Sequence, residues 1–342
     1  MTLGFDGTFN SSAEKVDGKG AIDMVYPIVL DFGLPDTIRQ ALVANVELIT
    51  RYPHQSTDLK SALADYLTVA PSQIMPTAGV NGGLDLVARA LLAGKKVLVP
   101  VPAFWQLALA PERYGATIVT CPLKDAAQMI ARFSACDAII LSHPNNPLGT
   151  KLPQDTVASL LAVAEKRLVI VDESYADLVG ETYASGTMPN NLIILRGFKA
   201  FLIPGARLGY VVGSDRLISR LHAFVPPFDV SVQAELAGIA VLGHLGEIKE
   251  IWSKVLRNRG ELEAALLKVG GTYSPSTTLF ACWQHPQAPA IGRALLARGV
   301  VTMFPGKSFI LGMPPDCIRL TARLPQIQEE AMRRLHEVMV AL

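Results

Sequence analysis

Apolar runs of strand length alternate with helical segments along residues 96–212, and this alternation constrains the fold more than any other feature. Within several runs, polar and apolar residues do not alternate, which is typical of strands that helices cover on both faces of a sheet. The predicted strands are Lys96–Val101, Ala116–Cys121, Asp137–Ser142, Leu168–Asp172, Asn191–Leu195 and Leu208–Val212. Repeated strand–helix–strand units predict an α/β fold with a mostly parallel central sheet.

The helical segments suggest how the chain divides into domains. Helical periodicity predicts helices over Asp36–Leu48, Gly82–Leu92, Pro153–Lys166, Val232–Val269 with an interruption near Gly243–Gly246, and Ile327–Ala341. After Val212 the strand-like runs become short, at Thr277–Trp283, Val300–Phe304 and Cys317–Thr321. We predict an N-terminal arm over residues 1–35 that packs with a smaller domain, a large domain over 36–230, and a small α+β domain over 231–342.

Composition and charge exclude several classes of protein. Half of the 342 residues are hydrophobic, and 31 basic residues almost balance 30 acidic ones, so the net charge is +1. A disordered chain would have low hydrophobicity and high net charge, and a nucleic-acid-binding protein would need a basic surface. Charged residues interrupt the longer apolar runs, which argues against a membrane-spanning helix. We therefore expect small-molecule partners, with no nucleic acid and no membrane.

The cysteines and histidines show no metal-binding pattern. The four cysteines form no Cys-x-x-Cys pair, and the six histidines lack the spacing of metal ligands. We expect four reduced, mostly buried thiols and no metal. No basic segment followed by an apolar core marks the start of the chain as a secretion signal, so we expect a cytoplasmic protein.

Polar residues follow three predicted strands, at the edge of a parallel sheet where ligands bind. Asn146 follows the strand that ends at Ser142, Asp172 ends the next, and Lys199 follows the strand that ends at Leu195. Each residue also has a purely structural interpretation: a turn for Asn146, a helix N-cap for Asp172 and a solvent-facing side chain for Lys199. A lysine in apolar surroundings can instead form a Schiff base.

Two further segments are suited to binding an anion. Thr77–Gly83 is a glycine-rich turn that opens a helix, where free backbone N–H groups and the helix dipole favour a phosphate. Its glycines do not match the Gly-x-Gly-x-x-Gly dinucleotide pattern. Arg207, eight residues after Lys199, can hold an anion through two hydrogen bonds.

In their order and spacing, these motifs resemble the class I/II aminotransferases, which have the fold type I structure and use pyridoxal 5′-phosphate. The pattern is similar to the histidinol-phosphate aminotransferase and threonine-phosphate decarboxylase branches. The resemblance implies three catalytic residues. Lys199 would form the Schiff base, Asp172 would keep the pyridine nitrogen protonated, and Tyr175 with Asn146 would bind the ring oxygen O3′. An electron-poor ring stabilises a carbanion at the substrate α-carbon.

The resemblance also implies the other contacts to the cofactor and substrate. Phe104 would stack on the ring, while the turn at Gly79, Val80 and Asn81 would hold the phosphate together with Arg207. Tyr52 would reach the phosphate of a partner subunit, which implies a homodimer. Arg319 would bind the substrate α-carboxylate.

The chain departs from the family pattern at three places. Phe198 and Arg196 stand where the family has Ser or Thr, and the segment before Lys199 is one residue short. Losing one charge-assisted hydrogen bond to phosphate would weaken cofactor binding by roughly 10- to 150-fold without abolishing it. Tyr26 is a predicted substrate contact, although around it an apolar stretch replaces an Asn-rich substrate-binding segment of the family. Arg323, four residues after Arg319, can bind a second anionic group of the substrate or face solvent.

The resemblance implies an aminotransferase that moves an amino group between an amino acid and a keto acid by ping-pong kinetics. The same residues also serve α-decarboxylation, elimination or cyclisation, because the bond that breaks depends on the orientation of the substrate. A catalytically degenerate regulator that binds the cofactor is the other alternative.

Overall fold

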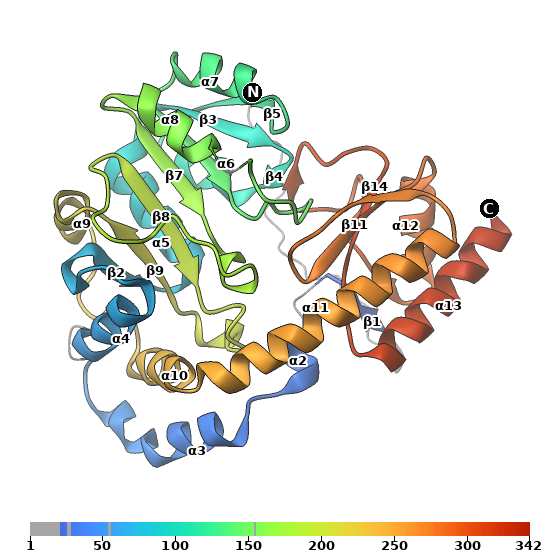
Figure 1. Cartoon of the computed structure of the whole chain (residues 1–342), viewed down its shortest axis with the longest axis horizontal. Coiled ribbons are helices and arrows are strands. Elements are labelled where there is room, and N and C mark those ends of the chain that lie inside the picture. The colour runs from blue at the N-terminus through green and yellow to red at the C-terminus, as the bar shows by residue number, and fades with distance from the viewer. Residues whose placement is uncertain (1–20, 26–28, 54–55, 154) are drawn as a thin grey trace.

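The computed structural model describes residues 21–25, 29–53, 56–153 and 155–342. At its centre lies a seven-stranded sheet with the order β2-β9-β8-β7-β6-β3-β5 (Figure 1). The strands β5, β3, β6, β7 and β8 are parallel, and β9 runs antiparallel to both β8 and β2. Their bounds are β2 Ile74–Thr77, β3 Lys96–Val101, β5 Thr117–Pro122, β6 Ala138–Ser142, β7 Leu168–Asp172, β8 Leu192–Gly197 and β9 Gly209–Gly213. The predicted α/β class with a mostly parallel sheet is confirmed.

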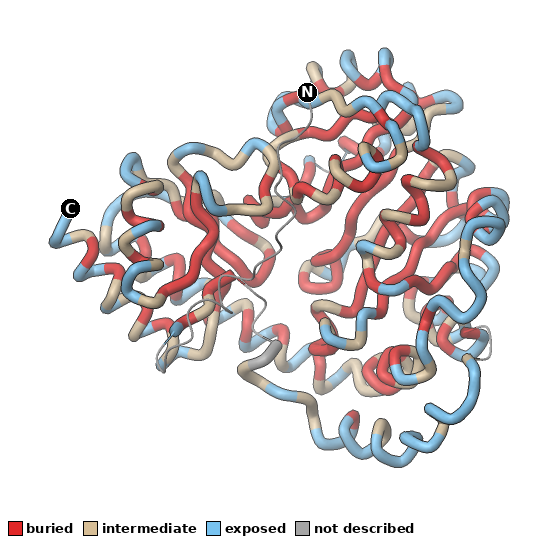
Figure 2. The backbone as a smooth tube through the Cα atoms, turned by 180° about the vertical axis from the view of Figure 1, so that it is seen from behind, coloured by how far each residue is buried: buried red, intermediate tan, exposed pale blue. Residues whose placement is uncertain are grey.

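Helices cover both faces of the sheet, which explains why its strands are apolar throughout. On one face, Val97 and Val99 of β3 share a core with α5 (Gly79–Val87), α6 (Gln106–Glu112) and α9 (Asp215–His222). On the other face, Leu98 shares a core with α4 (Thr57–Leu67), α7 (Ala126–Phe133) and α8 (Thr156–Ala164). Successive strand residues point to opposite faces, so each strand contributes to both cores. Figure 2 shows the central strands as the most continuously buried part of the chain.

The C-terminal part forms a second, smaller unit beside the sheet (Figure 1). Its antiparallel sheet has the order β10-β11-β14, and β1 near the N-terminus pairs with β12. Its elements are β1 Ile22–Asp23, β10 Thr272–Ser274, β11 Phe280–Gln284, α12 Ala288–Ala297, β12 Val300–Val301, β14 Cys317–Thr321 and α13 Pro325–Ala341. The predicted helical stretch from Val232 is two helices, α10 (Val232–Gly243) and the 24-residue α11 (Leu245–Lys268).

The junction between the two units does not fall at one residue. Helix α10 packs against α3 (Asp36–Ala44) and α4, whereas α11 continues to the antiparallel sheet. The short elements are α2 Val29–Phe32, η1 Val46–Thr50, η2 Pro71–Gln73, η3 Ala88–Leu92, β4 Ala103–Phe104, η4 Ala176–Leu178, η5 Pro204–Ala206 and β13 Ile310–Leu311. The domain limits at residues 35 and 230 stay a prediction. Within the described residues, no helix has both the length and the apolarity that a membrane crossing requires.

Two of the cysteines form a disulfide, so the prediction of four reduced thiols is wrong. Cys282 of β11 and Cys317 of β14 are joined, with their Cα atoms 6.0 Å apart, while Cys121 and Cys136 are free and buried. The antiparallel register sets Cys282 opposite Arg319, two residues from Cys317, and so brings the two cysteines diagonally together. Their sequence separation of 35 carries no such signal.

Candidate active site

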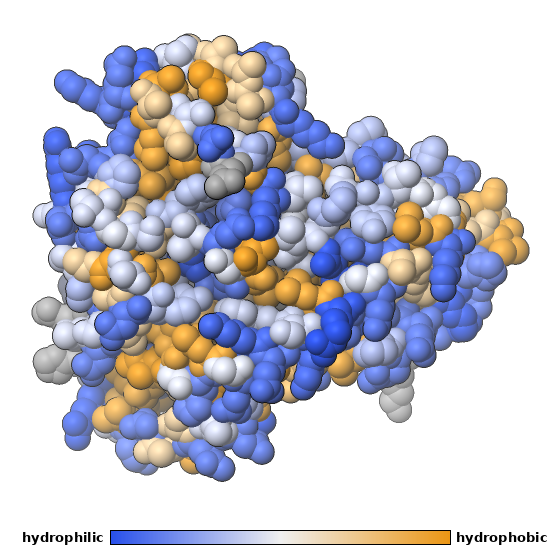
Figure 3. Space-filling model, viewed as in Figure 1, coloured by the Kyte–Doolittle hydropathy of each residue, from blue (hydrophilic) through white to orange (hydrophobic). Residues whose placement is uncertain are grey.

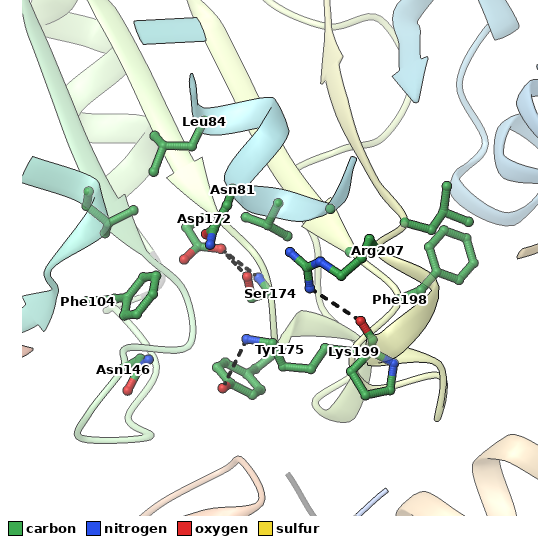
Figure 4. Close-up of a pocket in the computed structure, with 16 residues that line it drawn as sticks. Asn81, Leu84, Phe104, Asn146, Asp172, Ser174, Tyr175, Phe198, Lys199 and Arg207 are labelled. Atoms are coloured by element: carbon green, nitrogen blue, oxygen red, sulfur yellow. Dashed lines mark hydrogen bonds between the residues drawn. The ribbon is translucent and has the colours of Figure 1, made fainter. Parts of the chain in front are cut away.

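A pocket opens where the parallel strands end and α5 begins (Figure 4). The predicted residues that line it are Gly79, Val80, Asn81, Phe104, Asn146, Asp172, Tyr175, Lys199 and Arg207. The fold brings them together because β6, β7 and β8 are neighbours and parallel, so their carboxyl ends lie at one edge of the sheet.

Asp172 ends β7 and lies in the wall of this pocket with its carboxylate buried. Burial raises the pKa of the Asp172 carboxyl, while hydrogen bonds from Ser174 and the charge of Lys199 act in the opposite direction. Its Oδ1 accepts hydrogen bonds from the Ser174 hydroxyl at 2.5 Å and from the Ser174 backbone N–H at 3.0 Å. The Asp172 side chain is therefore held in one orientation.

Lys199 follows β8 and reaches the Tyr175 side chain in the pocket (Figure 4). Its Nζ donates to the Tyr175 hydroxyl at 3.4 Å and lies 4.7 Å from the centre of that ring. Lys199 is half-buried, whereas Tyr175 is buried against Phe280 of β11. An amine in this position can form a covalent bond to a ligand in the pocket while the Tyr175 hydroxyl orients it.

One end of the pocket is a cradle of backbone and guanidinium groups. Helix α5 begins at Gly79, three residues earlier than predicted, so Val80 and Asn81 lie in its first turn. A Cβ at Gly79 would lie 2.9 Å from the Arg207 guanidinium, and a Cβ at Gly209 would lie 2.6 Å from the Val80 backbone nitrogen. The close approach of β9 to α5 therefore requires glycine. Free N–H groups, the helix dipole and Arg207 together favour a phosphate here.

The two residues before Lys199 that depart from the family pattern, Phe198 and Arg196, have no hydroxyl to offer this cradle. Phe198 lines the pocket, but its ring packs against Phe201 and Tyr210, with ring centres 5.1 Å and 5.8 Å away. Arg196 is not among the residues that line the pocket, and its guanidinium binds Glu173, Asp177 and Tyr210. The Arg196 guanidinium therefore lies away from the phosphate cradle.

Arg319 does not line the pocket itself but contacts Asn146, which does. Its Nη1 donates to Asn146 Oδ1 at 3.0 Å, its Nη2 donates to the Val25 carbonyl at 2.8 Å, and its guanidinium stacks 4.3 Å from the centre of the Phe280 ring. Burial lowers the pKa of Arg319, and its Nε has no hydrogen-bond partner in the described part of the chain. Among the described residues, no carboxylate forms an ion pair with this buried cation.

The remaining predicted residues lie elsewhere. Arg323 is part-buried, and its guanidinium forms a two-pronged ion pair with Asp31 at 2.6 and 2.7 Å. Tyr52 does not line the pocket; it is 80% exposed and stacks on Phe228 with ring centres 4.7 Å apart. Tyr26 lies outside the described residues.

The comparisons with known proteins agree with this geometry. The family model for aminotransferase class I and II matches residues 30–339. The chain belongs to this family. A histidinol-phosphate aminotransferase from Roseiflexus castenholzii is 30% identical over 300 residues, which cover 82% of this chain and 79% of the relative. Another from Ralstonia nicotianae is 30% identical over 312 residues, covering 86% of this chain and 82% of the relative.

Solved structures of other family members share the fold. A histidinol-phosphate aminotransferase from Sinorhizobium meliloti in complex with pyridoxal 5′-phosphate matches with a TM-score of 0.85 and 21% identity over 99% of both chains. L-threonine-O-3-phosphate decarboxylase from Porphyromonas gingivalis matches with a TM-score of 0.78 and 24% identity, over 94% of this chain and all of that one. This chain is a pyridoxal-phosphate-dependent aminotransferase of fold type I.

The pocket fits the cofactor of this aminotransferase family on its own chemistry. An amine, a carboxylate and a glycine-lined anion cradle occupy three sides of one cavity, as a phosphorylated pyridine aldehyde requires. The described residues hold no cluster of three or more His, Cys, Asp or Glu side chains for a metal ion.

Residue-by-residue prediction missed two features of this aminotransferase site. Ser174 lines the pocket and binds Asp172, and the signal for it was the spacing, since Asp side chains often accept from the N–H two residues on. For Arg196, the sequence indicates only that it stands where the family pattern has Ser or Thr. Its two carboxylate partners, Glu173 and Asp177, stand on either side of Tyr175 in the sequence, but only the fold places all three together.

Proposed function

We propose that this aminotransferase moves an amino group between an amino acid and a keto acid, with Lys199 as the residue that binds pyridoxal phosphate covalently. The observation that carries the proposal is the convergence of Lys199, Asp172 and the Arg207 cradle on one pocket. These groups belong to elements that are separate in the sequence, so their convergence is a property of the whole fold.

Each group has a distinct part in this proposal. Bound pyridoxal phosphate supplies a carbonyl for the amino group and an electron-poor ring. Asp172 accepts a hydrogen bond from the ring nitrogen and stabilises its positive charge. The Nζ of Lys199 accepts the proton from the substrate α-carbon and returns it, while the Tyr175 hydroxyl orients Nζ. Phe104 covers the ring and excludes water.

Arg319 is the proposed site for the substrate carboxylate. It is buried and lacks an anionic partner among the described residues, and such a charge is costly unless a ligand pairs with it. Its contact to Asn146 places it next to the pocket, on the side of the antiparallel sheet. Arg323 is bound to Asp31, so we do not extend the substrate site to it.

We also propose that the enzyme is a homodimer in which Tyr52 serves the partner's site. Helix α3 buries only Ile38, and Val43, Val46, Ile49 and Tyr52 leave an apolar face exposed around α3 and η1. Figure 3 shows apolar side chains over this lower part of the molecule. An exposed apolar face of this kind marks an interface. The cytoplasmic location of the protein stays a prediction.

Borohydride reduction of the enzyme with pyridoxal phosphate, followed by peptide mapping, tests the assignment of Lys199. The label should fall on Lys199, and the Lys199→Ala variant should take up none, whereas the exposed Lys124→Ala control should label like the wild type. Label on another lysine would contradict the proposal. Incubation with amino acids should yield keto acids; release of carbon dioxide or ammonia without amino-group transfer would instead show decarboxylation or elimination.

A second experiment tests the shared site. Tyr52→Ala subunits and Lys199→Ala subunits should each be inactive alone, and mixing them should restore activity, because a mixed dimer contains one complete site. Sedimentation should show a dimer. A monomer, or no recovery on mixing, would contradict the role of Tyr52.

A further inference from the structure

Ser174 is the residue of the site whose contacts are least explained by the proposed function. It lines the pocket and is buried, and both of its donors, the hydroxyl and the backbone N–H, bind the same atom, Asp172 Oδ1. No described residue donates to the other carboxylate oxygen, Oδ2. Ser174 thus occupies one half of the carboxylate and leaves the other half for a ligand (Figure 4).

These two bonds fix the direction of the carboxylate. A lone hydrogen bond lets an Asp side chain turn about its terminal torsion, which is broad and roughly two-fold. Here both donors belong to Ser174, two residues further along the chain, and together they hold Oδ1 toward the turn at Ser174. Because the Oγ–Oδ1 distance is 2.5 Å, the hydroxyl proton is directed at Asp172 and is not available to a ligand.

The same hydroxyl favours the ionised carboxylate. Burial raises the pKa of Asp172, and the Ser174 hydroxyl is the strongest influence in the opposite direction, ahead of the Lys199 charge. Hydrogen bonds to a carboxylate stabilise its charged form. A protonated pyridine nitrogen needs an ionised acceptor, so a neutral Asp172 would bind the ring poorly.

We propose that Ser174 is a positioning residue for the pyridine nitrogen of the cofactor: its hydroxyl holds the Asp172 carboxylate turned so that Oδ2 meets the ring. The proposal rests on the proposed role of Asp172. It predicts that Ser174 matters only for a ligand that carries the ring nitrogen, and this distinguishes it from a residue that merely supports the fold.

The experiment compares pyridoxal phosphate with its 1-deaza analogue, in which a carbon replaces the ring nitrogen. Equilibrium binding to the full-length apoprotein is measured for the wild type, Ser174→Ala and Ser174→Thr. We expect Ser174→Ala to weaken binding of pyridoxal phosphate about ten-fold, the low end for a lost charge-assisted hydrogen bond, and to leave the analogue unchanged. Ser174→Thr keeps the hydroxyl and should bind both ligands like the wild type.

Asp172→Asn separates a failure of this proposal from a failure of the proposed function. If Asp172 faces the ring nitrogen, Asp172→Asn alone should reduce the preference for pyridoxal phosphate over the analogue, and adding Ser174→Ala should change nothing further. An effect of Asp172→Asn without an effect of Ser174→Ala would overturn only the role of Ser174. An equal loss of both ligands in Ser174→Ala would also overturn it. No effect of Asp172→Asn on the preference would overturn the role of Asp172 itself.

Discussion

Arg196 and Glu173 form an ion pair that is almost completely buried, with Nη1 and Oε2 2.6 Å apart. The same guanidinium binds Asp177 and donates to the Tyr210 hydroxyl at 3.0 Å. Burial would lower the pKa of Arg196, but Asp177, Tyr210 and Glu173 together raise it above its ordinary value, so the guanidinium stays charged. One cation thereby joins β8 to both ends of the segment that carries Tyr175.

The Arg196→Met variant should lose about 3–5 kcal/mol of unfolding free energy, because it leaves two buried carboxylates without their cation. The matched control is Arg196→Met with Glu173→Gln and Asp177→Asn, which removes the charges together and should recover most of that loss. Urea unfolding measures both. A loss below about 1 kcal/mol in the single variant would contradict a stabilising network.

Gly209→Ala should weaken cofactor binding, because its Cβ would lie 2.5 Å from the Gly79 carbonyl carbon and 2.6 Å from the Val80 nitrogen. The backbone of α5 would have to move away from the anion cradle. Gly205→Ala is the matched control, since its Cβ meets nothing within 4 Å. Fluorescence titration with pyridoxal phosphate should separate the two variants, and equal affinities would show that the close approach is not needed.

Phe198→Ser introduces the hydroxyl that the family resemblance leads us to expect at this position, yet we expect no gain in cofactor affinity. Phe198 is buried against Phe201 and Tyr210, and its replacement should cost about 3–5 kcal/mol as for other buried Phe truncations. Phe198→Leu should lose less, because it refills part of the space. Tighter binding of pyridoxal phosphate by Phe198→Ser would show that this position faces the phosphate after all.

Thiol titration of the unfolded, unreduced protein should find only Cys121 and Cys136, because Cys282 and Cys317 are joined. Replacing the pair by alanine should destabilise the protein by about 3–4 kcal/mol, the loop-closure value for 35 residues. Four reactive thiols in protein purified without reductant would instead support the prediction of a reducing compartment.

Stability should fall as the pH drops below about 6.5 because of His143. Burial lowers the pKa of His143, despite the opposing influence of Glu181, so the unfolded chain takes up a proton that the folded chain does not. The free energy of unfolding therefore rises with pH between the lowered pKa of folded His143 and the ordinary value of 6.5, by at most about 1.4 kcal/mol per pH unit.

His143→Asn should remove this part of the pH dependence, since its amide oxygen can still accept from the Leu152 N–H that now binds Nδ1. Urea unfolding at about pH 7.5 and about pH 5 measures the slope. An unchanged slope in His143→Asn would assign the effect to other groups, such as Glu181, which pairs with Lys151.

The class of fold and the residues at the strand ends follow from the amino-acid sequence alone. Continuous apolar runs require cover on both faces, and parallel strands bring their carboxyl ends to one edge. Asp172, Asn146 and Lys199 could be identified for that reason, and the resemblance then supplied their proposed roles.

The contacts between residues distant in sequence depend on how the elements pack in three dimensions. Side-chain direction along β7 and β8 turns Asp172 toward the pocket and Arg196 toward Glu173, which no motif shows. The antiparallel course of β9 sets Gly209 against α5, and the register of β11 and β14 joins Cys282 to Cys317. Arg323 meets Asp31 across 292 residues. Such pairings depend on how the packed elements are oriented, because local sequence patterns specify an element and its buried face but not its neighbour.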